Sequence, residues 1–267
     1  AHTYYDTTRY ADAGSIVIQS DTGNIVLNDS GVLSASGATA GGHAGLLKVG
    51  ASEGEFQNSG TLLGKAANGY DGGSFQLDVK VLSDFAAINT PLEDGGFSMS
   101  RNFRVRTGDV ALNQDVKAHT FELATDAGSI TLSKKIDASG DTGGRIALSA
   151  SGSLTLQDGA DLSVAGQNFS SAGKGGKIFI AAGSQTTGAV DATATLNLEA
   201  GSLDLSVASY IAGNYDQSGS SAFEGKFQGV LHLRAPRSDS AIQIDPVASA
   251  INGASAIVVE GYKLYDI

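Results

Sequence analysis

The sequence has no cysteine and no tryptophan, only 3 prolines in 267 residues, and fewer basic than acidic side chains. The absence of cysteine excludes disulfide bonds and cysteine-ligated metal sites. The net charge of −11 and the pI near 4.6 argue against nucleic acid and anionic membrane surfaces as partners, because both require a cationic face. No apolar run approaches the roughly 20 residues of a membrane-spanning helix, so we expect no membrane insertion.

The start of the chain also lacks two features. It begins at Ala1 without an initiator methionine, and its first residues have neither the charged nor the apolar region of a signal peptide. We therefore expect an excised or processed piece of a longer protein.

Glycine, by contrast, is abundant. The 36 glycines are nearly twice the usual share of about 7%. Such an excess is expected in turns, where backbone freedom is needed. A chain that is 41% apolar and only 17% charged does not have the composition of a disordered protein.

Strict alternation of apolar and polar residues is the main structural signal. Ile16 and Ile18 share one face of a predicted strand, and Val17 lies on the other face. The same alternation recurs at further pairs of inner residues: Ile25/Leu27, Leu33/Ala35, Phe75/Leu77, Ile130/Leu132, Ile146/Leu148, Leu154/Leu156, Leu162/Val164, Ile178/Ile180, Leu196/Leu198 and Leu203/Leu205.

Turns recur at a short, nearly fixed interval. Gly14, Gly23 and Gly31 each precede a strand, and Gly144 and Gly152 do the same further along the chain. The segment Asp-Ala-Gly-Ser-Ile occurs twice, at 12–16 and at 126–130. This cadence predicts an all-β, right-handed parallel β-helix with about three short strands per coil.

The predicted organisation is an irregular segment at residues 1–12, followed by a single β-helix at 13–267 with a long loop at 209–228. An antiparallel sandwich is the alternative, because it also has short strands with turns every 8–12 residues. It is less favoured because hairpin dipeptides are rare here, Asn-Gly occurring only at 68–69 and 252–253.

The run Gly-Gly-Arg-Ile-Ala-Leu-Ser-Ala-Ser-Gly-Ser-Leu-Thr-Leu at 143–156 resembles the shaft repeats of filamentous-haemagglutinin-like exoproteins. The stretch Ile-Val-Val-Glu-Gly-Tyr-Lys-Leu-Tyr-Asp at 257–266 is similar to segments of very large members. The resemblance implies a bacterial protein exported by two-partner secretion through an outer-membrane transporter, extracellular or on the outer-membrane surface. It also implies a role in adhesion, biofilm cohesion or toxin display. The Asn-Pro motif of the family's secretion domain is absent, which indicates a shaft segment.

No residues have the spacing of a known catalytic or metal site. The four histidines are scattered and have no metal-type partner at short spacing: His2, His43, His119 and His232. We therefore expect no catalytic residue, no cofactor and no metal. Calcium binding at Asp-rich turns is the one possibility left open.

Two pairs of aspartates are candidates for a polysaccharide-cleaving site. Asp137 and Asp141 lie in one loop, and Asp158 and Asp161 bracket another. Glycosidase chemistry needs two carboxyl groups about 5–9 Å apart in a groove. Aspartate is also favoured in turns through its own backbone hydrogen bonds, and we interpret these residues as turn residues.

Arg101, Arg104 and Arg106 form the nearest approach to a basic cluster. Alternation places Arg104 and Arg106 together on the outer face. We name the three as a candidate ligand-binding site for a carboxylate or sulfate of a glycan. A solvated strand face, or pairing with Asp109 and with neighbouring coils, is the alternative interpretation.

The sequence thus favours a structural and adhesive segment of a large fibre-like exoprotein, a rigid rod that presents binding surfaces, over an enzyme. Its expected partners are a host or neighbouring-cell surface, glycans, or other copies of the fibre. The alternative is a β-helix lyase or glycoside hydrolase with a lateral carboxylate groove, which the absence of tryptophan for sugar stacking disfavours.

Overall fold

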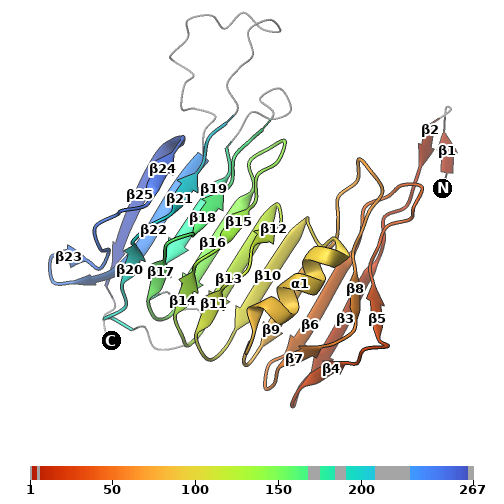
Figure 1. Ribbon diagram of the computed structural model, residues 1–267, viewed down its shortest axis with the longest axis horizontal. Helices are drawn as coiled ribbons and strands as arrows, with labels where there is room; N and C mark the ends of the chain where they lie inside the picture. Colours follow the sequence, from red (N-terminus) through yellow and green to blue (C-terminus); the bar gives the residue numbers. More distant parts are fainter. Residues whose placement is uncertain (1, 5–6, 168–174, 184–190, 208–228, 264–267) are drawn as a thin grey trace, which may run out of the picture.

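The chain folds as an all-β protein with parallel sheets and one short helix (Figure 1). The computed structural model describes residues 2–4, 7–167, 175–183, 191–207 and 229–263. The parallel pairing of the strands excludes the antiparallel sandwich as the architecture of this part of the chain.

The longest sheet runs the length of the molecule (Figure 1). Its parallel strands are β3 (Ser15–Ser20), β6 (Leu46–Ala51), β9 (Ser74–Val79), β10 (Ser100–Val105), β13 (Thr120–Thr125), β16 (Arg145–Ala150), β19 (Lys177–Ala181), β22 (Gly229–Ser238) and β25 (Ala254–Tyr262). A short antiparallel strand, β23 (Ala241–Ile242), pairs with the end of β22.

Two further series of short parallel strands follow the long sheet. The second series is β4 (Ile25–Leu27), β7 (Phe56–Asn58), β11 (Val110–Leu112), β14 (Ile130–Leu132), β17 (Leu154–Leu156) and β20 (Leu196–Leu198). The third series is β5 (Val32–Ser34), β8 (Thr61–Leu63), β12 (Val116–Lys117), β15 (Lys135–Asp137), β18 (Asp161–Ser163), β21 (Ser202–Asp204) and β24 (Ala250–Asn252). We call one long-sheet strand, with the short strands that follow it, a unit; β3, β4 and β5 form the first unit.

The helix α1 (Phe85–Gly95) takes the place of the short strands in the third unit, after β9. Asp84 caps its first turn by accepting a hydrogen bond from the Ala86 amide, and Gly96 ends it at φ 81°. The helix contacts β8 on one side and β11 and β12 on the other. It therefore divides both short-strand series, because β7 does not pair with β11 and β8 does not pair with β12.

This helix was not predicted, although the sequence carries its signals. Its buried residues Phe85, Ile88 and Leu92 have helical rather than alternating spacing, and the capping residues flank them. Pro91 inside the segment argued against a helix, because proline removes one backbone hydrogen bond.

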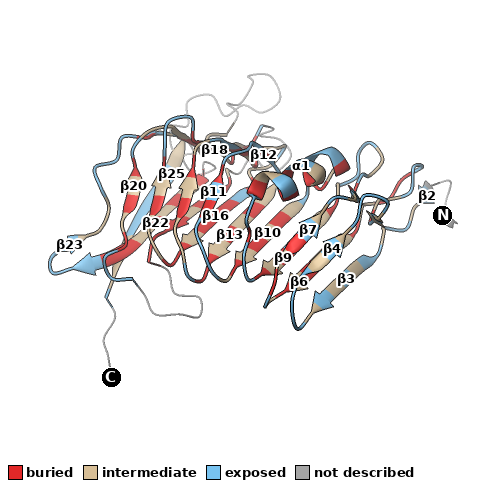
Figure 2. Cartoon of the chain, turned by 60° about the horizontal axis from the view of Figure 1, so that its bottom comes forward, coloured by how far each residue is buried: buried red, intermediate tan, exposed pale blue. Residues whose placement is uncertain are grey.

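The core consists of the inner side chains of successive units, stacked along the molecule (Figure 2). The predicted inner pairs from Phe75/Leu77 onward are buried, and the predicted strand positions are confirmed. Around α1, phenylalanines fill the wider interior: the rings of Phe75, Phe85, Phe103 and Phe121 pack with centroids 5.6 to 6.2 Å apart. Each of these side chains is at most 3% exposed.

A glycine lies at the start of six long-sheet strands or directly before it, whereas Met99 and His119 occupy this position at β10 and β13. Register places these glycines in one column, at one level of the sheet: Gly14, Gly45, Gly73, Gly144, Gly176 and Gly229. The backbones of adjacent units touch there: a Cβ on Gly45 would lie 1.8 Å from the Gly14 carbonyl oxygen, and one on Gly176 would lie 2.1 Å from that of Gly144. Close approach of backbones, and not only turn geometry, therefore explains this part of the glycine excess.

The remaining expectations on organisation have separate outcomes. Residues 1–12 contain an antiparallel pair of strands, β1 (His2–Tyr4) and β2 (Thr7–Arg9). The predicted loop at 209–228 lies outside the described residues. The two Asp-Ala-Gly-Ser-Ile segments are not equivalent in space, because the first leads into β3 of the long sheet and the second into β14 of the second series.

Candidate functional site

The outer face of the long sheet carries a cluster of four charged side chains, which we call the arginine cluster: Asp78, Arg104, Arg106 and Asp126. The Arg106 Nε and Nη2 atoms donate to the two carboxylate oxygens of Asp78, at 2.8 and 3.0 Å. Arg104 donates to Asp126 mainly at one oxygen, with its Nε and Nη2 atoms 3.0 and 2.7 Å from Oδ2. A contact of 3.9 Å between Arg104 Nη1 and Asp78 Oδ2 links the two pairs.

Register explains this arrangement. Arg104 lies beside Asp78 on the neighbouring strand, and Arg106 and Asp126 follow two positions beyond Arg104 and Ala124 respectively. The hydrogen bonds and charge of Asp78 raise the pKa of Arg106 above its ordinary value. Arg104 and Arg106 are about one-third exposed, at 30% and 35%, whereas Asp126 is 7% exposed. The cluster is a charge-balanced network on the outer face, in which two arginines pair with two aspartates.

Arg101 does not share this surface. Its side chain is 1% exposed and lies in the interior beside α1. Its guanidinium donates to the Asn89 side chain at 2.7 Å and pairs with Glu93 at 2.8 Å. It also donates to two backbone carbonyl oxygens, of Phe97 and Lys117.

Burial lowers the pKa of Arg101, and the charge of Glu93 partly opposes that effect. The residue ties α1 to β10, because two of its four partners belong to the helix. Strand alternation alone already places Arg101 on the inward face, because it lies two positions before the inward-facing Phe103. The ligand-binding role of the three arginines stays a prediction, and of the three only Arg104 and Arg106 have exposed side chains.

The partners of these arginines were largely missed from the sequence. Asp109, the aspartate considered there, accepts from the Ser129 amide at 2.7 Å instead. Asp78 and Asp126 lie 28 and 22 residues from their arginine partners. These partners become neighbours only because the intervening unit has the right number of residues, and this number varies from unit to unit. The alternating pattern gives the face of a residue but not its neighbour across units.

Further ion pairs on the outer face also join adjacent strands. Glu122 on β13 accepts from Asn102 on β10 at 2.7 Å and from Arg145 on β16 at 2.6 Å. Near the other end, Glu260 on β25 contacts Arg234 and His232 of β22, each at 3.0 Å. The Arg234 guanidinium stacks on the ring of Tyr262, 4.3 Å from its centroid. Charge on this face therefore links one unit to the next.

Two of the four candidate aspartates, Asp137 and Asp161, have hydrogen bonds of the kind expected for turns and strand edges. Asp137 accepts from the amide and hydroxyl of Ser139 and pairs with Lys135 at 3.0 Å. Burial raises the pKa of Asp137, but these contacts outweigh it and hold that pKa below the ordinary 3.8. Asp161 accepts from the Ser202 hydroxyl of the next unit at 2.7 Å.

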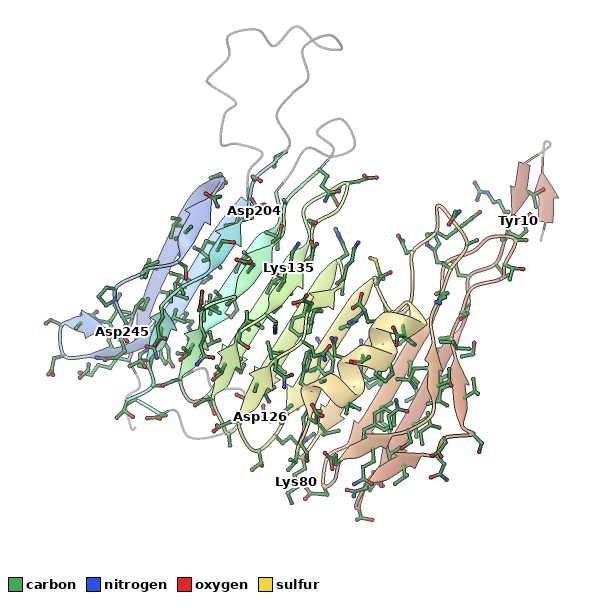
Figure 3. All side chains as sticks on the ribbon, viewed as in Figure 1. Tyr10, Lys80, Asp126, Lys135, Asp204 and Asp245 are labelled. Carbon is green, nitrogen blue, oxygen red and sulfur yellow. The ribbon has the colours of Figure 1, made fainter. Side chains whose placement is uncertain are left out.

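Charged groups are spread over the fold rather than gathered in one place. Figure 3 shows Lys80 and Asp126 toward the bottom of the molecule, Lys135 near its middle and Asp204 toward its top. Within the part of the chain that the structure describes, no three His, Asp or Glu side chains are grouped as metal ligands. His43 has a local partner, since its Nδ1 accepts from the Asp71 amide at 2.9 Å.

The helix α1 is far too short to cross a membrane, and no other described segment forms a spanning helix. Comparison of the sequence with protein-family models and with curated proteins, and of the structure with solved structures, finds no match.

Proposed function

We propose that this chain is a structural and adhesive segment of a large exported bacterial exoprotein of the filamentous-haemagglutinin-like type. In this proposal its three series of strands wind as a right-handed parallel β-helix. The resulting rod spaces and presents binding surfaces outside the cell, after export through an outer-membrane transporter. Its partners are a neighbouring cell surface, glycans or further copies of the fibre.

One observation carries the proposal: parallel pairing continues from β3 to β25 along the long sheet, without a register shift as far as β22 and with one irregularity, between Gly229 and Val230, where β22 pairs with β25. Each long-sheet strand is hydrogen-bonded through its backbone to the next, the interior units bury apolar side chains in the same rows, and ion pairs on the outer face join several neighbouring units. Repeated contacts between nearest neighbours are the means by which repeat proteins gain length and stiffness.

The arginine cluster supports a binding role over a hydrolytic one. A glycosidase needs one carboxyl group to give a proton and a second to attack or to activate water. Both carboxylates of the cluster are instead engaged by guanidinium groups. Arg104 and Arg106 are each about one-third exposed, and a carboxylate or sulfate of a glycan is the kind of group that arginine side chains recognise.

The test combines binding with turnover. The purified chain, immobilised on beads, is offered sulfated, carboxylated and neutral glycans, and release of reducing ends or of unsaturated sugars is followed in parallel. We expect retention of acidic glycans, its weakening in Arg104→Gln and Arg106→Gln, and no release of fragments. Sustained depolymerisation would overturn the proposal in favour of an enzyme. If neutral glycans were retained as strongly as acidic ones, the arginine cluster would no longer be the proposed binding site.

The winding itself is tested separately by a crystal structure. A right-handed path through all three series is the expected result. A left-handed path, or sheets that do not close around a common core, would contradict the β-helix.

A further inference from the structure

Three consecutive strands of the long sheet carry basic side chains and no acidic ones. The strands β16, β19 and β22 contain no aspartate or glutamate, in a chain with 28 acidic and only 17 basic residues. Their outward positions include Arg145 on β16, Lys177 on β19, and His232 and Arg234 on β22. Together with Phe179 of β19, we call these residues the basic panel.

The basic panel has an excess of positive charge that the arginine cluster lacks. Glu122 on one flank pairs with Arg145, and Glu260 on the other flank pairs with Arg234. Lys177 lies beside Arg145 in register and is exposed, and its side chain has no ion pair or hydrogen bond with another residue that the structure describes. Three cations therefore face two carboxylates here, whereas the arginine cluster has two of each.

An aromatic ring lies at the centre of the basic panel. Phe179 points outward and is partly exposed, and its neighbours in register are His232 on β22 and Ala147 on β16. The His232 ring packs against it at 69°, with the centroids 5.0 Å apart, whereas the neighbour on the β16 side has only a methyl group. The row of Lys177 and the row of Arg234 lie two residues away on either side along the strands. An apolar ring is thereby placed between two cationic rows.

We propose that the basic panel binds a carboxylated polysaccharide, a chain that contains uronic acid units. Carboxylates of the sugar chain pair with Lys177 and with the guanidinium of Arg145, because arginine matches the planar carboxylate group. The apolar C–H face of a sugar ring lies on Phe179, and Glu122 and Glu260 accept hydrogen bonds from sugar hydroxyl groups. The inference rests on the glycan-binding role proposed above, and it adds a second site and a class of ligand to that role.

The same residues disfavour other polyanions. The net charge of −11 and the carboxylates on both flanks repel a polymer as densely charged as nucleic acid, whose duplex carries one charge per about 1.7 Å. Phosphate groups only accept hydrogen bonds, so they offer no donor to Glu122 or Glu260. A polysaccharide with uronic acid units carries its charges further apart and has hydroxyl donors between them.

The extent of the basic panel fits an oligosaccharide rather than a single sugar. Arg234 lies two strands across the sheet from Arg145 and four residues further along the strand direction. At the strand spacing and rise of a β-sheet, the backbones of these two residues are about 16 Å apart. One sugar unit cannot contact both cationic rows and the ring between them, so affinity should increase with the length of the sugar chain.

The test uses hexagalacturonate, an oligomer of one uronic acid, with its methyl ester as the uncharged form. Binding to the whole chain is measured by isothermal titration calorimetry. Lys177→Gln and Arg145→Gln remove charge from the basic panel, and Phe179→Leu removes the ring but keeps an apolar side chain. Lys48→Gln, which removes the same charge from an outward position of β6 in the same sheet, is the matched control. All four side chains are outward and at least partly exposed, so circular dichroism should show that every variant is folded.

We expect the hexamer to bind more tightly than single galacturonate and more tightly than the methyl ester. Lys177→Gln and Arg145→Gln should each weaken binding about tenfold, which is the lower end for a hydrogen bond to a charged group. Phe179→Leu should weaken it about threefold, because ring stacking is lost. Lys48→Gln should bind like the wild type. Binding should also weaken as the salt concentration rises.

Unchanged binding in the three panel variants would overturn this inference. If Arg104→Gln and Arg106→Gln weakened binding instead, the proposed function would stand with the arginine cluster as its site. A wild type that does not bind the hexamer would also overturn the basic panel as a site, and retention of sulfated glycans would then leave the proposed function intact. Equal affinity for single-stranded DNA or for phosphatidylserine vesicles would indicate a surface for any polyanion and would overturn the choice of ligand.

Discussion

Substituting Gly144 by alanine tests whether backbone contact between units holds this fold together. Gly144 precedes β16 in the middle of the long sheet, where the chain cannot respond by fraying. A Cβ there would lie 2.2 Å from two carbonyl oxygens, of His119 and of Ala138. Ordinary van der Waals contact begins at 3.4 Å, so the backbone must move by about 1 Å away from both.

The magnitude follows from what that movement disturbs. Overpacking a well-packed interior costs about 1–3 kcal/mol. The displaced segment also makes the hydrogen bond from Arg145 N to His119 O and receives the one from Lys177 N to Gly144 O, each 2.9 Å long. Weakening these two adds about 1–2 kcal/mol. We expect a loss of about 2–5 kcal/mol in the free energy of unfolding, or about 10 °C in the melting midpoint.

Gly14→Ala is the matched control, because the same column offers nothing within 4 Å at that position. Its melting midpoint should be unchanged or slightly higher, since alanine reduces the entropy of the unfolded chain by the equivalent of about 0.4–1 kcal/mol. Circular dichroism melts of both variants, at concentrations where both are monomeric, provide the comparison. Equal changes in melting midpoint for Gly144→Ala and Gly14→Ala would refute the view that contact between the backbones of adjacent units requires glycine in this column.

Three further tests, which use five substitutions, address the buried charge, the core and the acid response. Arg101→Met should lower the free energy of unfolding by about 3–5 kcal/mol in urea titrations. The double variant with Glu93→Gln should lose little more, because the two residues act as one network. Losses that simply add up would count against such a network. Leu148 is 0% exposed, so Leu148→Ala should lower the free energy of unfolding by about 2–5 kcal/mol. Ser149→Ala, at the outward position next to it, should lower it by less than about 0.5 kcal/mol. Similar losses for the two variants would contradict the assigned faces. The folded-state pKa of Asp137 is lowered, so its contribution is present above the ordinary 3.8 and is lost as the pH falls through the lower folded value. Asp137→Asn should therefore flatten the loss of stability below about pH 4, and an unchanged acid profile would show that its contacts contribute nothing.

The strands and their buried faces were predictable because alternation is a local signal. Each inner pair, such as Ile146 and Leu148, reports its own face without reference to the rest of the chain. The helix α1 was missed because its signals compete with a proline and with the surrounding strand pattern. Local patterns also do not say which sheet a strand joins, as the two Asp-Ala-Gly-Ser-Ile segments show.

The charged surface was predictable only in part, for a related reason. Strand alternation placed Arg104 and Arg106 on one face. The structure has both residues on that face, where they pair with Asp126 and Asp78 respectively. The pairing depends on how many residues each unit contains. Equivalent positions are 20 residues apart between β10 and β13 but 42 apart between β17 and β20. Such variable spacing hides neighbours across units from any fixed-period analysis of the sequence.

The helix α1 has a mechanical consequence. Between the second and fourth units α1 interrupts both short-strand series, so the ladders of β9 with β6 and β10 are the continuous ladders there, supplemented by single backbone hydrogen bonds such as that from Gly64 N to Gly95 O. The rest of any load along the long axis passes through side chains, chiefly the apolar face of α1 and the contacts of Arg101. We therefore expect a stretched or bent chain to yield first at this level, where the fewest ladders join one unit to the next.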